Sequence, residues 1–263
     1  MGQVARALGD AARYERSVRI RSPQPNALQA NDIAEQYLRF GPVERALEWL
    51  TRSDERSERT SDARLDLQAQ AYEKLGNREA LVAARRCLAE RSLSTQRFAK
   101  YVSLLSPDES DAARQQALER AERTDDPVAA GLFLLDLGAL DQASAVILRQ
   151  HERLGSAFYE HLLSLAERLD EAGRPLPAVA CYRALTEQIL SEGRSKAYRH
   201  ARRYVDRMSA LDLSVDEYRD LSGHTEYLAH LRERHGRNFS FWQLFEGAAP
   251  KAARRAFTRQ RAR

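Results

Sequence analysis

Glycines recur at a spacing of 35 residues in this chain, and each precedes an apolar run opened by an alanine. Gly41 is followed by Gly76 after 35 residues, and Gly138 by Gly173 after the same interval. A glycine can end a helix in the left-handed conformation, and a small residue lets the next helix pack closely. A period near 34 residues is typical of stacked helix–turn–helix repeats. The spacing therefore predicts a helical solenoid.

The composition favours helices over strands. Among the 263 residues, Leu (34) and Ala (41) far outnumber Val (10) and Ile (4). Leu and Ala stabilise helices, whereas β-branched residues favour strands. Hydrophobic residues make up 43% of the chain, enough for a packed core. We therefore expect an all-α fold, an α-solenoid of about six antiparallel helix pairs that curves around a concave groove.

Turn residues divide the chain into apolar-periodic segments, and each segment is expected to form one helix. The expected helices are 27–40, 42–53, 61–75, 77–91, 94–105, 108–123, 127–137, 139–151, 155–172, 175–192, 195–211, 214–235 and 239–247.

Three segments around the glycines resemble the helix–turn–helix core of a tetratricopeptide repeat. They are residues 71–81 (AYEKLGNREAL), 40–47 (FGPVERAL) and 137–143 (LGALDQA). The Trp and the terminal Pro of the repeat consensus are mostly missing from them. The resemblance implies a tetratricopeptide-like superhelix that binds proteins or peptides.

Three segments of the C-terminal half resemble a bacterial helical-repeat family of unknown function. They are residues 178–185, 193–204 and 227–242, and the resemblance covers roughly residues 60–245. Similar repeats form the C-terminal part of bacterial SWIM zinc-finger proteins. The SWIM motif itself, Cys-x-Cys followed by Cys-x-His, is absent from the sequence, so its zinc and DNA-binding roles are not carried over.

Positive charge is concentrated at the two ends of the chain. Residues 251–263 hold six basic side chains and no acid, and residues 1–22 hold five Arg against two acids. We expect a basic N-terminal arm or linker over 1–25, either a fraying amphipathic helix or a disordered arm in its first 22 residues. One continuous solenoid domain should follow over 26–248, and a basic tail over 249–263.

Several functional classes lack their sequence signals. No apolar run approaches the roughly 20 residues of a membrane span, and the N-terminus does not resemble a signal peptide. Cys87 and Cys181 have no Cys or His at metal-ligand spacing. We therefore expect a cytoplasmic protein with reduced, buried thiols and no membrane partner.

Catalytic motifs are also absent from the sequence. It contains no His-Glu-x-x-His, no Gly-x-Ser-x-Gly and no phosphate-binding Gly-x4-Gly-Lys segment. We expect no catalytic residues, no metal and no cofactor, and hence a chain that is not an enzyme.

The segment 195–211 carries the clearest candidate for a binding surface. Lys196, Arg199, Arg203 and Arg207 share one flank, roughly 115° from an apolar stripe of the same helix. The stripe consists of Ala197, Ala201, Tyr204, Met208 and Leu211. Cations clustered in this way suit a phosphate or an acidic peptide. The alternative is a solvated face whose cations pair with neighbouring acids. The leading hypothesis is a non-enzymatic scaffold in the bacterial cytoplasm that uses these four residues to bind a protein or peptide in the groove.

The basic tail supports a second hypothesis. A run of cations is typical of salt-sensitive, sequence-independent contact with nucleic acid. A nucleic-acid-associated protein would use the stripe together with Lys251, Arg254, Arg255 and Arg259. A tail that only aids solubility is the structural alternative.

Overall fold

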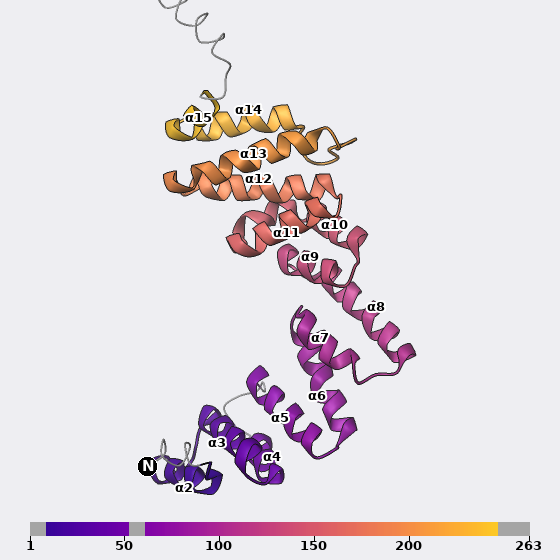
Figure 1. The fold of residues 1–263 in the computed structure, drawn as a ribbon, viewed down its shortest axis with the longest axis vertical. Helices are drawn as coiled ribbons and strands as arrows, with labels where there is room; N and C mark the ends of the chain where they lie inside the picture. Colours follow the sequence, from indigo (N-terminus) through magenta and orange to yellow (C-terminus); the bar gives the residue numbers. More distant parts are fainter. Residues whose placement is uncertain (1–8, 53–60, 247–263) are drawn as a thin grey trace, which may run out of the picture. The chain divides into compact units, whose positions relative to one another are not determined.

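The structure is a computed structural model that describes residues 9–52 and 61–246. Every regular element in these two ranges is a helix, which confirms the expected all-α class (Figure 1). The chain divides into two compact units, residues 1–117 and 118–263, and the division falls inside one helix, α8.

The described helices of the first unit follow one another with short connections. They are α2 (Ala11–Arg21), α3 (Ala27–Phe40), α4 (Val43–Thr51), α5 (Asp62–Lys74), α6 (Arg78–Arg91), α7 (Thr95–Val102) and the first part of α8 (Pro107–Arg123). Consecutive helices from α2 to α7 pack against each other, and α3 also packs against α5. Ile33, Trp49 and Leu50 are fully buried between the first of these helices and provide the apolar core there.

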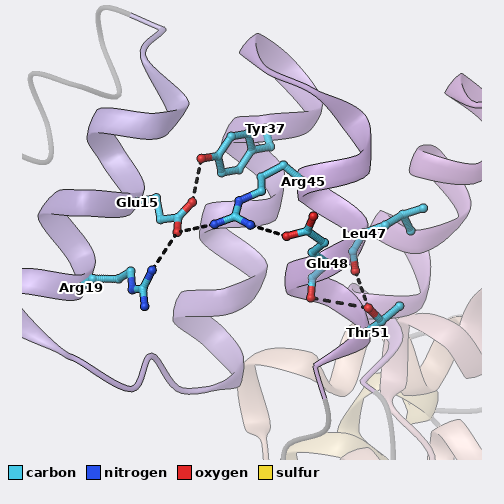
Figure 2. Close-up of polar contacts among 7 residues, drawn as sticks. All are labelled: Glu15, Arg19, Tyr37, Arg45, Leu47, Glu48 and Thr51. Atoms are coloured by element: carbon cyan, nitrogen blue, oxygen red, sulfur yellow. Dashed lines mark hydrogen bonds and ion pairs between the residues drawn. The ribbon is translucent and has the colours of Figure 1, made fainter.

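The N-terminal helix α2 is bound to this core through a buried carboxylate. Glu15 is 5% exposed and accepts hydrogen bonds from the Tyr37 hydroxyl (2.7 Å) and from Arg45 Nη2 (3.1 Å), as Figure 2 shows. Arg19 lies 3.5 Å from the same carboxylate. Burial by itself raises the pKa of Glu15, but the hydrogen bonds from Tyr37 and Arg45 outweigh it and hold the pKa below its ordinary value. Residues 11–21 are thus a helix packed on the core, neither a fraying helix nor a disordered arm.

The second unit continues with alternating helices and short connections. Its elements after α8 are α9 (Pro127–Asp136), α10 (Leu140–Arg149), the 3₁₀ helix η1 (His151–Ser156), α11 (Tyr159–Glu171), α12 (Pro175–Ser191), the 3₁₀ helix η2 (Ser195–Ala197), α13 (Tyr198–Asp212), α14 (His224–His235) and α15 (Phe239–Glu246).

Helix α12 is the centre of this unit. It packs against α10, α11, α13 and η1, while α9 packs against α10 and α11. Its residues Val179, Cys181 and Leu185 are fully buried, which explains why α12 is apolar on nearly all sides. The last described helix, α15, packs against α13 and buries Phe241 and Trp242.

Three expected helix starts are wrong. Residues 155–158 precede α11, residues 195–197 form the 3₁₀ helix η2, and residues 214–223 are turns and bends before α14. In the last case, side chains hold the segment in a non-helical path. The Tyr218 hydroxyl donates to Asp212 (2.5 Å), and Arg183 Nη2 donates to the Ser222 carbonyl (2.7 Å). Tertiary contacts therefore override the local helix propensity there.

Three of the four spaced glycines end their helices as expected. Gly76, Gly138 and Gly173 have φ of 68°, 71° and 67°, in the left-handed region that a side chain disfavours. Gly41 differs, since its φ of −143° is extended, as is common for a residue before proline. A Cβ at Gly41 would lie 2.7 Å from the Tyr37 ring, so this glycine permits close packing instead.

The finer expectations about organisation stay predictions. They concern the solenoid arrangement, its continuity as one domain, and the boundaries at residues 25/26 and 248/249. The basic tail lies outside the described residues. No helix in the described part of the chain is both long and apolar enough to cross a membrane.

Candidate partner-binding surface

Helix α13 presents one apolar face to the second unit and one basic face to solvent. Ala201, Tyr204, Met208 and Leu211 are buried, as the apolar stripe predicts. Arg199, on the opposite flank, is exposed. The helix starts at Tyr198, so Lys196 lies on η2, one turn before the regular helix.

Three of the four predicted cations are available for a partner. Lys196, Arg199 and Arg203 are exposed, and their side chains form no hydrogen bond or ion pair with any other described residue. Exposed cations without a local counter-charge keep their full charge for an incoming anion. The three residues are called the basic surface below.

Arg207 has a structural contact instead. Its Nε and Nη2 each donate a hydrogen bond of 2.5 Å to the Asp170 carboxylate of α11. The Asp170 side chain is 9% exposed and also accepts a hydrogen bond of 3.3 Å from the Tyr182 hydroxyl. The hydrogen bonds to Asp170 raise the pKa of Arg207. Arg207 therefore pairs with a neighbouring acid, which is the alternative to a binding role that the sequence leaves open.

An open pocket of about 430 Å³ lies beside the basic surface, between α11, α12 and α13. It is lined by Glu167, Tyr182, Arg203, Tyr204, Asp206, Arg207 and Ala210. Tyr182 and Tyr204 are 5% and 6% exposed, and their rings stack with centroids 5.6 Å apart. The two tyrosines therefore form the bottom of the pocket, and we refer to it as the tyrosine pocket.

The hydroxyl groups of the two tyrosines are already engaged. Tyr204 shares a short hydrogen bond with Tyr159, and Tyr182 donates to Asp170. Burial, together with these contacts, raises the pKa of both tyrosines, so they stay neutral at physiological pH. The bottom of the tyrosine pocket consequently offers aromatic surface rather than charge.

Two unpaired charges of opposite sign remain at the walls of the tyrosine pocket. Asp206 accepts a hydrogen bond of 2.8 Å from Arg202, and Arg207 is bound to Asp170. Glu167 on α11 and Arg203 on α13 are exposed, and neither is paired with another described residue. The pocket thus provides one free anion and one free cation on facing helices.

The structure brings only part of the predicted stripe to this pocket. Arg203 and Arg207 line it, whereas Lys196 and Arg199 do not. Sequence reasoning missed Glu167, Tyr182 and Tyr204 as surface-forming residues. Tyr204 is singled out in the sequence, but only as a member of the apolar stripe. The pocket itself could not be predicted, because it depends on the tertiary contact between α11, α12 and α13. The predicted nucleic-acid contacts Lys251, Arg254, Arg255 and Arg259 lie outside the described residues.

Metal-ligating clusters and accessible thiols would be further candidates for reactive centres in the described ranges. No group of three or more His, Cys, Asp or Glu side chains there could hold a metal ion. Cys181 is fully buried, and burial raises the pKa of its thiol. Cys87 is half-buried and forms no disulfide, so the expectation of a buried thiol is wrong at this position.

Together these observations define the class of protein: an all-helical chain with an unpaired basic surface beside an aromatic pocket. The chain belongs to DUF6880, a family of unknown function, whose model matches residues 1–244. The match extends over the described helices of both units. No curated protein and no solved structure matches the chain.

Proposed function

We propose that this chain is a non-enzymatic helical-repeat scaffold that binds an acidic segment of a protein partner through Lys196, Arg199 and Arg203. The observation that carries the proposal is that these three cations are exposed and unpaired, while the neighbouring Arg207 is bound to Asp170. A cluster of unpaired cations on α13 and on the 3₁₀ turn before it is suited to anionic groups.

The tyrosine pocket supports a binding role over a catalytic one. Of the titratable groups that line the pocket, the Asp206 carboxylate is held by Arg202 and the hydroxyls of Tyr182 and Tyr204 are hydrogen-bonded, which leaves Glu167 as its one free carboxylate. Groups held in this way fix the shape of a wall and are poor proton donors or acceptors for a substrate.

The wider proposal is that the helix pairs are tetratricopeptide-like repeats, stacked as a solenoid in a bacterial cytoplasmic protein. It is supported by the left-handed glycines at Gly76, Gly138 and Gly173 and by the packing of consecutive helices within each unit. The resemblance of residues 178–185, 193–204 and 227–242 to a bacterial helical-repeat family is an analogy that favours the same proposal.

Affinity capture from bacterial lysate with the full chain tests the proposal. Three baits are compared: the unchanged chain, a variant with Lys196, Arg199 and Arg203 changed to Ala, and a control with Arg13, Arg16 and Arg237 changed to Ala. The control residues are exposed, and their side chains are unpaired within the described residues. We expect a discrete protein that survives nuclease treatment, is retained by the control and is lost with the first variant.

Equal capture by the two triple variants would reject the basic surface as the binding site. Recovery of nucleic acid alone, lost at high salt and on deletion of 251–263, would replace the proposal by the nucleic-acid alternative.

A further inference from the structure

We infer that the partner segment bound by the basic surface has a mixed charge pattern, with acidic residues at alternating positions followed by one basic residue that enters the tyrosine pocket and pairs with Glu167. The inference rests on the proposed function and specifies the chemistry of its partner. Glu167 is then the residue that determines specificity.

Glu167 is the unpaired anion of the pocket, and Arg203 is its unpaired cation. Glu167 lies on α11 across from α13, is exposed, and has no ion-pair partner in the described ranges, although arginines surround the pocket. Arg203 and Arg207 do not neutralise it, since neither lies within ion-pair distance of its carboxylate and Arg207 is held by Asp170. A purely acidic segment that lies across the basic surface would meet this carboxylate as like charge. A basic residue at the same place converts the repulsion into attraction.

The bottom of the pocket suits the stem of such a basic side chain. Tyr182 and Tyr204 present ring surface there, and their hydroxyls are occupied by Asp170 and Tyr159. Lysine and arginine pack their methylene stems along apolar surface and keep the charged head at a polar rim. Glu167 lies among the residues that line the pocket and supplies that rim.

The spacing of the cations sets the register of the acids. Arg199 and Arg203 are one turn apart on α13, which corresponds to about 6 Å along the helix axis. An extended peptide advances about 3.3 Å per residue, so alternate side chains are spaced at about 6.6 Å. Acids at positions i and i+2 therefore match Arg199 and Arg203. The basic residue at i+4 reaches the tyrosine pocket, which lies on the Arg203 and Arg207 side of the helix.

Fluorescence anisotropy with three labelled peptides and the full chain tests the inference. The first peptide has the core Glu-Ser-Glu-Ser-Lys, the second replaces Lys by Gln, and the third replaces both Glu by Gln. We expect the first peptide to bind about two- to fivefold more tightly than the second, the upper part of the range for one exposed charge pair. The third should bind much more weakly than either.

Variants at α11 provide the matched comparison. Glu167→Gln should abolish the preference for the Lys peptide. Glu171→Gln, an equally exposed change on the same helix outside the pocket, should preserve it. Glu167→Lys should reverse the preference, so that a peptide ending in Glu binds more tightly than the Lys peptide.

Two outcomes separate the inference from the proposed function. Binding of both acidic peptides with equal affinity, or a Lys preference that survives Glu167→Gln, overturns the inference and leaves the proposed function standing. Failure of both acidic peptides to bind more tightly than the Gln-substituted peptide overturns the two together.

Discussion

Arg207 donates two hydrogen bonds of 2.5 Å to Asp170 and thereby joins α13 to α11. The carboxylate that receives them is 9% exposed and has the Tyr182 hydroxyl as its other partner. Because of this pair, Arg207 has a structural role that the other cations of the flank lack. Arg207 stabilises the packing of two helices, whereas Lys196, Arg199 and Arg203 remain free for a partner.

Arg207→Ala should destabilise the packing of α13 on α11. The change removes the main partner of a buried carboxylate, which costs about 1–3 kcal/mol when the acceptor loses its hydrogen bonds. Urea unfolding followed by circular dichroism measures the loss. Arg203→Ala is the control, because it removes an exposed and unpaired cation and should change the unfolding free energy by less than about 0.5 kcal/mol. Equal effects of the two changes would contradict the division of roles.

Glu15→Gln should loosen α2 and remove an acid-dependent part of the stability. Because the folded pKa of Glu15 is below its ordinary value of 4.5, the ionised form stabilises the folded state above that pH. This contribution is lost as the pH falls through the folded pKa. At pH 7 we expect a loss of about 1–3 kcal/mol, since Tyr37 and Arg45 lose a charged partner.

The fluorescence of Trp49, buried in the first unit, reports this unfolding in a Trp242→Phe background. The variant should show a flatter acid dependence than the unchanged Glu15 chain. A steep acid transition of equal size in both would assign the effect to other carboxylates.

Arg183→Met should release the segment between α13 and α14. Arg183 is 7% exposed, donates to the Ser222 carbonyl at 2.7 Å, and lies 4.4 Å from the centre of the Tyr227 ring. Loss of a charged hydrogen bond of about 1.5 kcal/mol should raise amide exchange in residues 213–223 about tenfold. Hydrogen-exchange mass spectrometry measures it, with Arg199→Met as the exposed control. Unchanged exchange in 213–223 would show that other contacts hold the segment.

The unfolding free energy of the second unit should fall in mild acid, because His224 is buried in its neutral form. Burial lowers the pKa of His224 below 6.5, more than Asp212 raises it, and its Nε2 lies 2.8 Å from the Ser209 hydroxyl. Since the unfolded chain then binds the proton more readily, the unfolding free energy falls as the pH drops below about 6.5, by at most about 1.4 kcal/mol per pH unit.

Trp242 fluorescence in a Trp49→Phe background follows this transition in the second unit. His224→Gln should remove the dependence, whereas His230→Gln, an exposed histidine on the same helix, should retain it. A dependence that persists in His224→Gln and disappears in His230→Gln would reverse the assignment.

Gly138→Ala should destabilise the chain although the site has room for a methyl group. No atom lies within 4 Å of a Cβ built there, so the cost comes from the φ of 71°, about 1 kcal/mol for a residue other than glycine. Gly155→Ala is the control, because that position is equally open and has no positive φ. Thermal unfolding that ranks the two variants equally would exclude backbone strain as the cause.

Local sequence patterns were sufficient for most of the helices. Helix α3 begins and ends as the pattern predicts, and Gly76, Gly138 and Gly173 take the left-handed turn because only glycine adopts it without strain. The apolar stripe of α13 is buried for the same local reason, since 3.6 residues per turn place those side chains on one face.

The tertiary structure decided what the charged residues do. Arg207 and Lys196 look equivalent in sequence, yet one meets Asp170, 37 residues away, and the other lies free on a 3₁₀ turn. Glu167, Tyr182 and Tyr204 form a pocket only because three helices meet, and Arg183 binds the Ser222 carbonyl at the end of a non-helical segment. Helix formation depends on neighbours within one or two turns, whereas the partner of a side chain depends on which distant helix packs against it.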